Sequence, residues 1–481
     1  MLWICSYQFT TNWHTVCQRV LKMHQNRDND LRYVESQRGR KLLLYNGFQF
    51  HKKYDNKDGS VMWRCTKAPA CFGSVRVLNE AVQKENPHSC DRSEITNVVK
   101  EALHNLKDRV KSLQGEPIST VYQETLLSLH ERGLNLVTNL PEFKNIKTGL
   151  YNARNKSHGV KKTTFKNGAE VEIPGTYQDF LLFDYQENET RIIGFASQEG
   201  RQRMATIRDF YADGTFKCCI KPFYQLYVIH GDLSNDSENS YIIPLVYVLL
   251  MSKKEKTYTT MFRLIKAQIP NWNPKKIVID FEKAVMNSIQ TVLPNTEIKG
   301  CYFHFCQALV KRAKQLKVTK NRNQLKHLAL CLALPLLPEH LIDDAYLYIM
   351  EDCPRENNIT KFNDYLVKTW LEGGKFPTHI WNVCGQKNRT TNALESWHAT
   401  INRFIPNKKI NMLKLLHVLK RDALLQNASM LQRQNGASTS SSANGKENED
   451  RINRAIQELV DQKIVLGHCL EKLAPFIYFK V

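Results

Sequence analysis

Four side chains of the types that bind zinc lie within a short stretch near the start of the chain. They are Cys65, Cys71, His88 and Cys90, with the spacing C-x5-C-x16-H-x-C. Thiolates and an imidazole in this combination complete a tetrahedral zinc shell, so we expect a structural Zn2+ held by these residues. The alternative is that they are ordinary reduced cysteines without a metal.

The residues around these ligands predict a small antiparallel β module over residues 39–92. Short apolar and aromatic runs such as Val61-Met62-Trp63 alternate with turn signals such as Asn46-Gly47 and Asp58-Gly59. A module of about fifty residues buries too little apolar surface to offset its chain entropy, which is why it depends on a metal. Residues 1–38 carry no pattern that we can interpret and stay unassigned.

The chain has 481 residues and a formal net charge of +21, which favours a polyanionic partner. We expect double-stranded DNA, because each phosphate neutralised by Lys or Arg releases a condensed counterion. A merely solubilising surface is the alternative. The basic residues gather in patches, and the candidate DNA contacts are Arg38, Arg40, Lys41, Lys311, Arg312, Lys314, Lys408 and Lys409.

Cysteine usage and hydropathy bear on the compartment. The chain has 13 cysteines, an odd number spread irregularly, which indicates a reducing environment rather than a disulfide framework. We find no targeting peptide and no apolar run long enough to span a membrane, so we expect no membrane partner. Together with a DNA partner, these features predict a nuclear location.

The rest of the chain divides by its periodicity. Helical spacing over residues 93–165 predicts a helical linker that is also a candidate DNA-binding region. From about residue 170 to 310 strands and helices alternate, which predicts a mixed sheet with helices on its faces, and residues 306 to about 425 are mainly helical. We expect residues 426–450, rich in Ser and Asn, to be disordered and residues 451–481 to form a terminal helix.

Two aspartates end apolar strands. Asp213 closes the run Tyr211-Ala212-Asp213, and Asp280 closes Lys276-Ile277-Val278-Ile279-Asp280. Burying an unpaired carboxylate is costly, so such an acid needs a partner, a metal or an open strand end. Glu395, on a predicted helix, is a third candidate ligand. Oxygen ligands suit Mg2+ or Mn2+, and two such ions support phosphodiester chemistry. Taken singly, each acid also fits a turn, cap or surface position.

The zinc-site segment resembles the FLYWCH zinc finger through Gly47-Phe48, Trp63-Arg64-Cys65, Cys71 and His88. It departs from that family at Cys90, where a second histidine is usual. Residues 170–425 resemble the Mutator-like element (MULE) transposase domain in seven blocks that occur in the family's order. The blocks are 212–216, 225–231, 244–247, 257–258, 280–284, 300–304 and 392–398.

The MULE resemblance implies a ribonuclease-H-like fold over residues 166–425, with a helical insertion at about 306–390 before the last acid. It also implies that Asp213, Asp280 and Glu395 form a catalytic triad that binds Mg2+ or Mn2+ and cleaves and joins DNA by DDE-type chemistry. Transposon terminal repeats are the implied substrate, and a homo-oligomer on DNA the implied assembly. Glu282 is a rival acid that the family pattern disfavours.

The family's Cys-x2-His element falls on Cys301 and His304, a candidate accessory pair. We predict a strand over residues 298–303, on which successive side chains point to opposite faces. Joint metal binding therefore requires the strand to end there, and a core cysteine beside a DNA-facing histidine is the alternative.

Three functions fit these features. The first is a DDE-type transposase or recombinase with the zinc finger and basic patches on DNA. The second is a domesticated transposase that acts as a zinc-finger transcriptional regulator without catalysis. The third is a zinc-dependent interaction scaffold without DNA contact, whose binding would be insensitive to salt because phosphate contacts impose a steep salt dependence.

Overall fold

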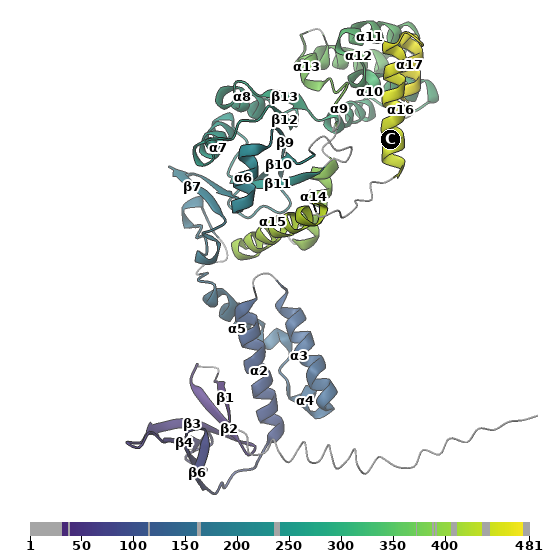
Figure 1. Ribbon diagram of the computed structural model, residues 1–481. Helices are drawn as coiled ribbons and strands as arrows, with labels where there is room; N and C mark the ends of the chain where they lie inside the picture. The colour runs from purple at the N-terminus through teal and green to yellow at the C-terminus, as the bar shows by residue number, and fades with distance from the viewer. Residues whose placement is uncertain are drawn as a thin grey trace, which may run out of the picture. The chain divides into compact units, whose positions relative to one another are not determined.

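The structure is a computed structural model. It describes residues 31–36, 39–113, 116–160, 165–234, 241–371, 373–386, 389, 392–405, 411–434 and 443–474. The chain divides into two compact units, Met1–Lys161 and Lys162–Val481 (Figure 1). Of the expected DNA contacts, Arg38, Lys408 and Lys409 lie outside the described residues. Within the described part, no helix has the length and apolar character needed to cross a bilayer.

The first unit begins with a six-stranded antiparallel sheet in which each strand pairs with its sequence neighbours. Its core gathers Leu43, Phe50, Trp63 and Val75 on one face of the alternating strands. The first strand of the sheet lies inside residues 1–38, the segment that the sequence left unassigned. β1 joins the sheet by pairing with β2, an interaction that no turn signal in the sequence indicates. The strands are β1 Arg32–Glu35, β2 Lys41–Tyr45, β3 Phe48–Asp55, β4 Val61–Cys65, β5 Ser74–Leu78 and β6 Ala81–Asn86.

Helices follow the sheet over the range where helical spacing predicts them. They are α2 Glu94–Ser112, α3 Ile118–Arg132, α4 Leu134–Asn139 and α5 Phe143–Ser157. The hydroxyl of Ser93 accepts a hydrogen bond from the backbone N–H of Thr96 and so caps α2. Leu106 and Val110 of α2 pack against Leu150 of α5 in a small apolar core.

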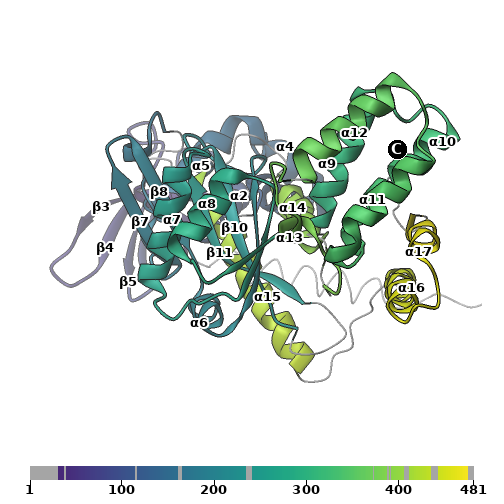
Figure 2. The same cartoon turned by 90° about the horizontal axis from the view of Figure 1, so that it is seen from above.

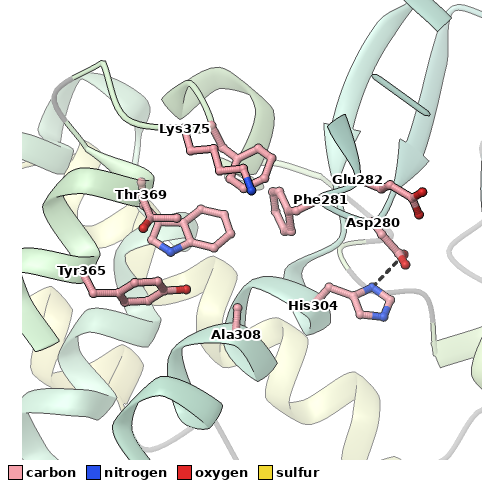
Figure 3. A pocket seen from close by; sticks show the side chains of 10 residues that line it. Asp280, Phe281, Glu282, His304, Ala308, Tyr365, Thr369 and Lys375 are labelled. Atoms are coloured by element: carbon pink, nitrogen blue, oxygen red, sulfur yellow. Dashed lines mark ion pairs between the residues drawn. The ribbon is translucent and has the colours of Figure 1, made fainter. Parts of the chain in front are cut away.

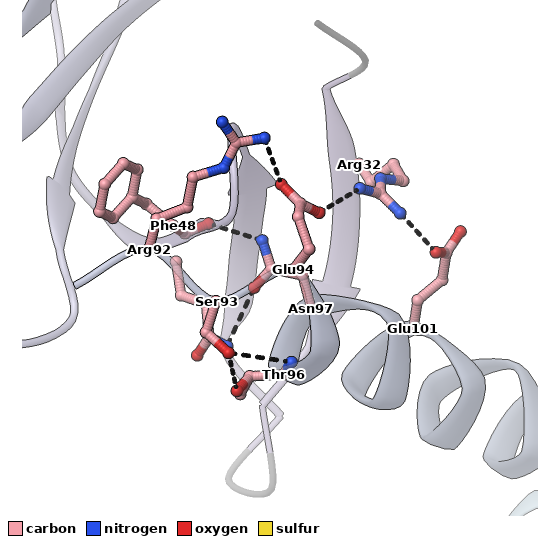
Figure 4. A network of polar contacts seen from close by, with 9 residues as sticks. Arg32, Phe48, Arg92, Ser93, Glu94, Thr96, Asn97 and Glu101 are labelled. Carbon is pink, nitrogen blue, oxygen red and sulfur yellow. Dashed lines mark hydrogen bonds and ion pairs between the residues drawn. The ribbon is translucent and has the colours of Figure 1, made fainter. Parts of the chain in front are cut away.

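A polar network joins the sheet to α2 (Figure 4). The buried Asn97 side chain donates to the carbonyl of Phe48 at 3.1 Å and accepts from Nε2 of Gln49 at 3.0 Å. Arg32 on β1 pairs with Glu101 at 2.8 Å. The zinc-site module and the helices are therefore one folding unit rather than a module and a free linker.

The second unit is built on a seven-stranded mixed sheet in the order β13-β12-β9-β10-β11-β8-β7 (Figure 1). Figure 2 shows β7, β8, β10 and β11 of this sheet from a second direction. β12 runs parallel to both β9 and β13, and the other pairs are antiparallel. The strands are β7 Leu181–Glu187, β8 Thr190–Phe195, β9 Asp209–Thr215, β10 Gln225–Asp232, β11 Ile242–Leu250, β12 Lys276–Ile279 and β13 Glu297–Gly300.

Helices cover both faces of this sheet, as its strand alternation requires. Phe210 and Ala212 of β9 face the apolar core that α7 (Glu255–Gln268) and α8 (Lys283–Val292) supply. Tyr211 faces the other side, where Leu394 of α14 (Asn392–Phe404) packs. α15 (Met412–Gln434) and α6 (Gln198–Thr206) both contact β11.

A group of helices is inserted between β13 and α14, at the place predicted for it. Its members are α9 Tyr302–Gln315, α10 Arg322–Ala333, α11 Ile342–Glu351, α12 Asn357–Trp370 and α13 Thr378–Trp381. The chain's last helices, α16 Ala443–Val460 and α17 Leu466–Leu473, join it, with α17 against α10 and α11 (Figure 1). Cys469, Leu470 and Leu473 are buried there.

Three local predictions differ from the structure. The strand predicted over 298–303 ends at Gly300, because α9 begins at Tyr302. α6 was not anticipated; the hydroxyl of Ser197 caps it. Helices occupy both ends of 426–450, the segment expected to be disordered, while residues 435–442 lie outside the described part. Asn427, at the start of this segment, forms hydrogen bonds with Arg203 and Glu199. The composition of the segment does not predict this tertiary contact.

Candidate functional site

The zinc-site residues converge at one end of the first sheet. Cys65 ends β4, Cys71 lies in the following turn, and His88 and Cys90 follow β6. The distances between ligand atoms are 3.7 Å for Cys65 Sγ to Cys90 Sγ, 3.3 Å for Cys71 Sγ to His88 Nδ1 and 3.6 Å for Cys90 Sγ to His88 Nδ1. Zn–S bonds of about 2.3 Å in a tetrahedron give S–S edges of about 3.8 Å, so the four residues fit zinc.

The electrostatics of this cluster also favour a cation. Burial and the neighbouring thiols of Cys71 and Cys65 raise the pKa of Cys90 to about 11. Burial also acts to raise the pKa of Cys71, but N–H groups of Gly73 and Ser89 outweigh it and lower that pKa to about 5. Thiols that oppose one another's ionisation can all become thiolates once a divalent cation lies between them.

Close contacts hold the histidine of this site in place. The ring of His88 stacks on Phe48 with a centroid separation of 3.6 Å. Gly73 lies under the same ring, and a Cβ at this glycine would come within 2.4 Å of the His88 ring. Gly73 is thus needed for close approach, a role that the sequence motif alone does not reveal.

The two candidate aspartates lie side by side in the second sheet, Asp213 two residues before the end of β9 and Asp280 directly after β12, so the expectation that Asp213 ends its strand is corrected. β9 and β12 are parallel neighbours with Val278 opposite Tyr211, so two residues further on Asp280 comes beside Asp213. Burial, followed by the nearby charge of Asp213, raises the pKa of Asp280 to about 8. Oδ1 of Asp280 is buried although 37% of its side chain is exposed.

Two histidines contact this acid pair, one from each flanking helix. Nδ1 of His304, on α9, lies 3.1 Å from Oδ1 of Asp280, and Nδ1 of His398, on α14, lies 3.5 Å from Oδ2 of Asp213. Burial lowers the pKa of both imidazoles, and the charge of Asp213 only partly opposes this. The site therefore combines two carboxyl groups with two imidazoles that burial keeps neutral.

Glu395, the third expected acid, lies on the face of α14 that carries His398, three residues later. Burial and the charge of Asp213 raise the pKa of Glu395, so Glu395 lies close enough to Asp213 to interact with it electrostatically. The three acids do not form a compact ligand set, however. Among the described residues, only the four zinc-site residues bring three or more ligand atoms within 4.8 Å of one another.

The rival acid and the accessory pair have different surroundings. Glu282 pairs with Lys253 at 3.0 Å and accepts a hydrogen bond from Tyr258 at 3.1 Å. Cys301 is buried beside Leu394 in the small core, whereas His304 reaches Asp280. The helix start at Tyr302 thus separates the accessory pair into a core cysteine and a site histidine.

A hydrophobic and hydrogen-bonded layer seats α14 on the sheet. Trp397 donates from Nε1 to Asp422 of α15 at 2.7 Å, and the hydroxyl of Tyr247 donates to the same carboxylate at 3.1 Å. The indole also meets the buried ring of His230 edge-on. Sequence reasoning missed His398, Trp397 and Asp422 as parts of the site; the spacing of Glu395 and His398 on one helix was the available signal.

A cavity of about 460 Å³ opens from Asp280 toward the inserted helices (Figure 3). Its walls are largely aromatic, from Phe281, Tyr365, Trp370 and Phe376, with the exposed Lys375 at its margin. Its volume falls in the range of about 300–1,000 Å³ that is typical of ligand pockets.

The described basic candidates are spread over both units. Arg40 and Lys41 are exposed at the start of β2. Lys311 and Lys314 are exposed on α9, and Arg312 lies over the ring of Tyr365, 5.5 Å from its centroid. The basic residues of α9 therefore lie on the same helix as His304, which contacts the acid pair near the start of that helix.

Comparison with known families supports this division of the chain. Residues 33–88 match the family model of the FLYWCH zinc finger domain, and residues 210–308 match that of the MULE transposase domain. No curated protein matches the chain. The second match includes both candidate aspartates and ends before Glu395. These two domains indicate a transposase-related DNA-binding protein with a Cys3His site suited to structural zinc.

Proposed function

We propose that this protein is a DDE-type DNA transposase or recombinase whose catalytic centre is the acid pair of the second unit. The observation that carries the proposal is that Asp213 and Asp280 are brought side by side by the parallel neighbours β9 and β12, close enough for Asp213 to raise the pKa of Asp280, in a partly buried setting. Carboxyl groups held this close oppose each other's ionisation, and a divalent cation removes the opposition. Perturbed acids of this kind cluster at functional sites.

Asp213, Asp280 and Glu395 are the residues that would hold Mg2+ or Mn2+. The bound ions would supply an activated attacking oxygen and stabilise the leaving one. His304 and His398 position the two aspartates through their Nδ1 atoms. α14, seated on the sheet by Trp397, brings Glu395 toward the pair, and closer approach of this helix completes the ligand set.

The proposal includes a ribonuclease-H-like fold for the second unit. Its support is the strand order: β9, β10 and β11 form an antiparallel meander, and β12 and β13 follow on the other side of β9 and parallel to it. This arrangement places the end of β12 next to β9, and so determines where the two acids meet.

Binding of DNA is proposed for both units. The zinc finger would place exposed Arg40 and Lys41 on phosphates, while Lys311 and Lys314 of α9 would hold the strand that reaches Asp280. Each such contact makes the affinity depend on salt concentration.

The test begins with duplexes selected from a random library by the full-length zinc-loaded protein. Selected DNA with MnCl2 is expected to be cleaved by the wild type, and not by Asp213→Asn, Asp280→Asn or Glu395→Gln, each of which should still bind. Asp209→Asn, at the other end of β9, is the matched control and should cleave normally. If the wild type binds at saturation and never cuts, the enzyme proposal fails.

That failure would leave the second candidate, a domesticated transposase that regulates transcription. One observation favours it: the three acids lie outside the mutual distance of 4.8 Å that the zinc-site residues satisfy. In this case the aspartate variants would bind DNA like the wild type, and cleavage would be absent from all of them.

Two further properties follow from the proposed function. We place the protein in the nucleus, which a fluorescent fusion of the full chain tests. We also propose a homo-oligomer that pairs two DNA ends, such as terminal repeats. Light scattering of the protein with and without selected duplex should then show more than one protein copy per complex.

A further inference from the structure

α5 differs in charge from the other long helices of the first unit. α2 carries Glu94, Glu101 and Asp108, and α3 also carries two glutamates, whereas α5 has neither Asp nor Glu. It does carry Lys144, Lys147, Arg154 and Lys156. The unit's last helix is therefore a purely basic segment on an otherwise mixed surface.

Three of the four cations of α2 pair with carboxylates within the fold, whereas those of α5 are largely without such partners among the described residues. Lys111 pairs with Asp108 at 2.7 Å, and Lys107 with Glu35 at 3.3 Å. Within the described residues, Lys147 and Lys156 have no carboxylate within ion-pair distance. Lys144 contacts Glu142 only through an exposed pair, which contributes little to stability. These lysines can therefore bind an anion from another molecule.

Packing leaves one side of α5 fully open. Phe143, Ile146 and Leu150, at helical spacing, face the apolar core shared with α2 and α3. Asn145, Thr148 and Asn152 are exposed, and their spacing puts them in one stripe on the opposite side of the helix.

Two of the lysines flank this stripe of small hydrogen-bonding side chains. At 3.6 residues per turn, Lys144 falls on one side of it and Lys156 on the other, while Lys147 lies further round on the side of Lys144, toward the apolar face. All three lysines are exposed. Amides in the centre with cations at both margins match the major groove of B-DNA, where base edges lie between two phosphate backbones.

We infer that α5 enters the major groove of duplex DNA and reads base edges with Asn145 and Asn152. The groove is about 12 Å wide and admits a helix of about 10–12 Å diameter. An asparagine amide pairs in bidentate fashion with adenine N6 and N7, so the sites read contain adenine. This inference rests on the proposed DNA binding of the first unit and is independent of catalysis by the second.

Duplex RNA is a poor fit to the same surface. The major groove of an A-form helix is deep and narrow, and side chains on a helix do not reach its bases. Duplex DNA is therefore the occupant that the shape and charge of α5 select.

The test uses the full-length zinc-loaded protein and duplexes selected from a random DNA library. Asn152→Ala and Asn145→Ala should each lose the preference for adenine at one position, by about 5- to 150-fold, which corresponds to the 1–3 kcal/mol of a bidentate pair. Lys147→Gln and Lys156→Gln should weaken all duplexes alike and reduce the salt slope by about one each. Asn135→Ala, an exposed asparagine of α4, is the matched control and should change neither quantity.

The outcomes separate this inference from the proposed function. If the wild type binds selected DNA with a steep salt dependence but both asparagine variants keep its base preferences, the reading role of α5 is wrong and DNA binding stands. If no duplex is selected and binding is insensitive to salt, the DNA-binding proposal itself fails. Equal competition by duplex RNA would overturn the groove assignment. Because the substituted side chains are exposed, the thermal transition should not change and loss of folding cannot imitate the result.

Discussion

Replacing Asp280 by asparagine should stabilise the second unit in the absence of divalent metal. Burial and the neighbouring Asp213 raise the pKa of Asp280 from about 4, its value in the unfolded chain, to about 8 in the folded one. Between these values the native state binds more protons than the unfolded state. By linkage, the free energy of unfolding then falls as pH rises through this window, and the uncharged amide of the variant removes that loss.

The magnitude follows from the exposure of the side chain. A fully buried acid would lose about 1.4 kcal/mol per pH unit in this window. Because 37% of the Asp280 side chain is exposed, solvent screening reduces this, and we take about half. Between pH 5 and pH 7 the variant should therefore gain about 1.5 kcal/mol over the wild type, or roughly 3 °C in transition temperature for a unit of this size.

The assay is denaturant unfolding of both proteins at pH 5, 6 and 7 with EDTA. Tryptophan fluorescence is weighted toward the second unit, which contains four of the chain's seven tryptophans, Trp272, Trp370, Trp381 and Trp397. A stability difference that stays constant from pH 5 to pH 7 refutes the reasoning. In a second arm, Mn2+ at pH 7 should raise the transition of the wild type more than that of the variant; an equal rise in both would place the metal elsewhere.

Three substitutions test other parts of the structure. Gly73→Ala should displace the ring of His88 and weaken the metal site at least tenfold, which a competition with a chromophoric zinc chelator measures; unchanged affinity would mean that the ring moves freely. Asn97→Ala removes the hydrogen bonds that the buried Asn97 amide makes to the half-buried Phe48 and Gln49 and should cost about 1–3 kcal/mol, with the zinc module and the helices unfolding together in one transition at lower temperature. Two separate transitions would contradict the single unit. Arg191→Met should cost about 1–3 kcal/mol in urea unfolding, because it removes the buried guanidinium that bonds Asp184 and the carbonyls of Gly168 and Val171; a loss below about 0.5 kcal/mol would show that water replaces these bonds.

Much of the architecture follows from local pattern. The spacing of the cysteines and His88 predicts a compact cluster, and turn signals delimit the strands around it. In the second unit, Asp213 and Asp280 were chosen because each closes an apolar run. Such runs become neighbouring buried strands, so the two acids come side by side. The alternation of side chains along β9, with Tyr211 on one face and Ala212 on the other, likewise follows from the period of a strand.

The features that the sequence left undecided depend on contacts between distant residues. Cys301 and His304 were ambiguous because a shift of the strand end by a few residues decides whether they share a face, and only the start of α9 resolves this. The place of His398 depends on how α14 seats against the sheet, and this seating rests on Asp422, 25 residues away from Trp397. The interactions that select these arrangements are non-local packing and hydrogen bonds, whereas periodicity reports only which face of an element is apolar. The sequence by itself therefore determined the cluster of zinc-type side chains, most of the strands and the two aspartates, and the tertiary structure decided which histidines and which helices surround them.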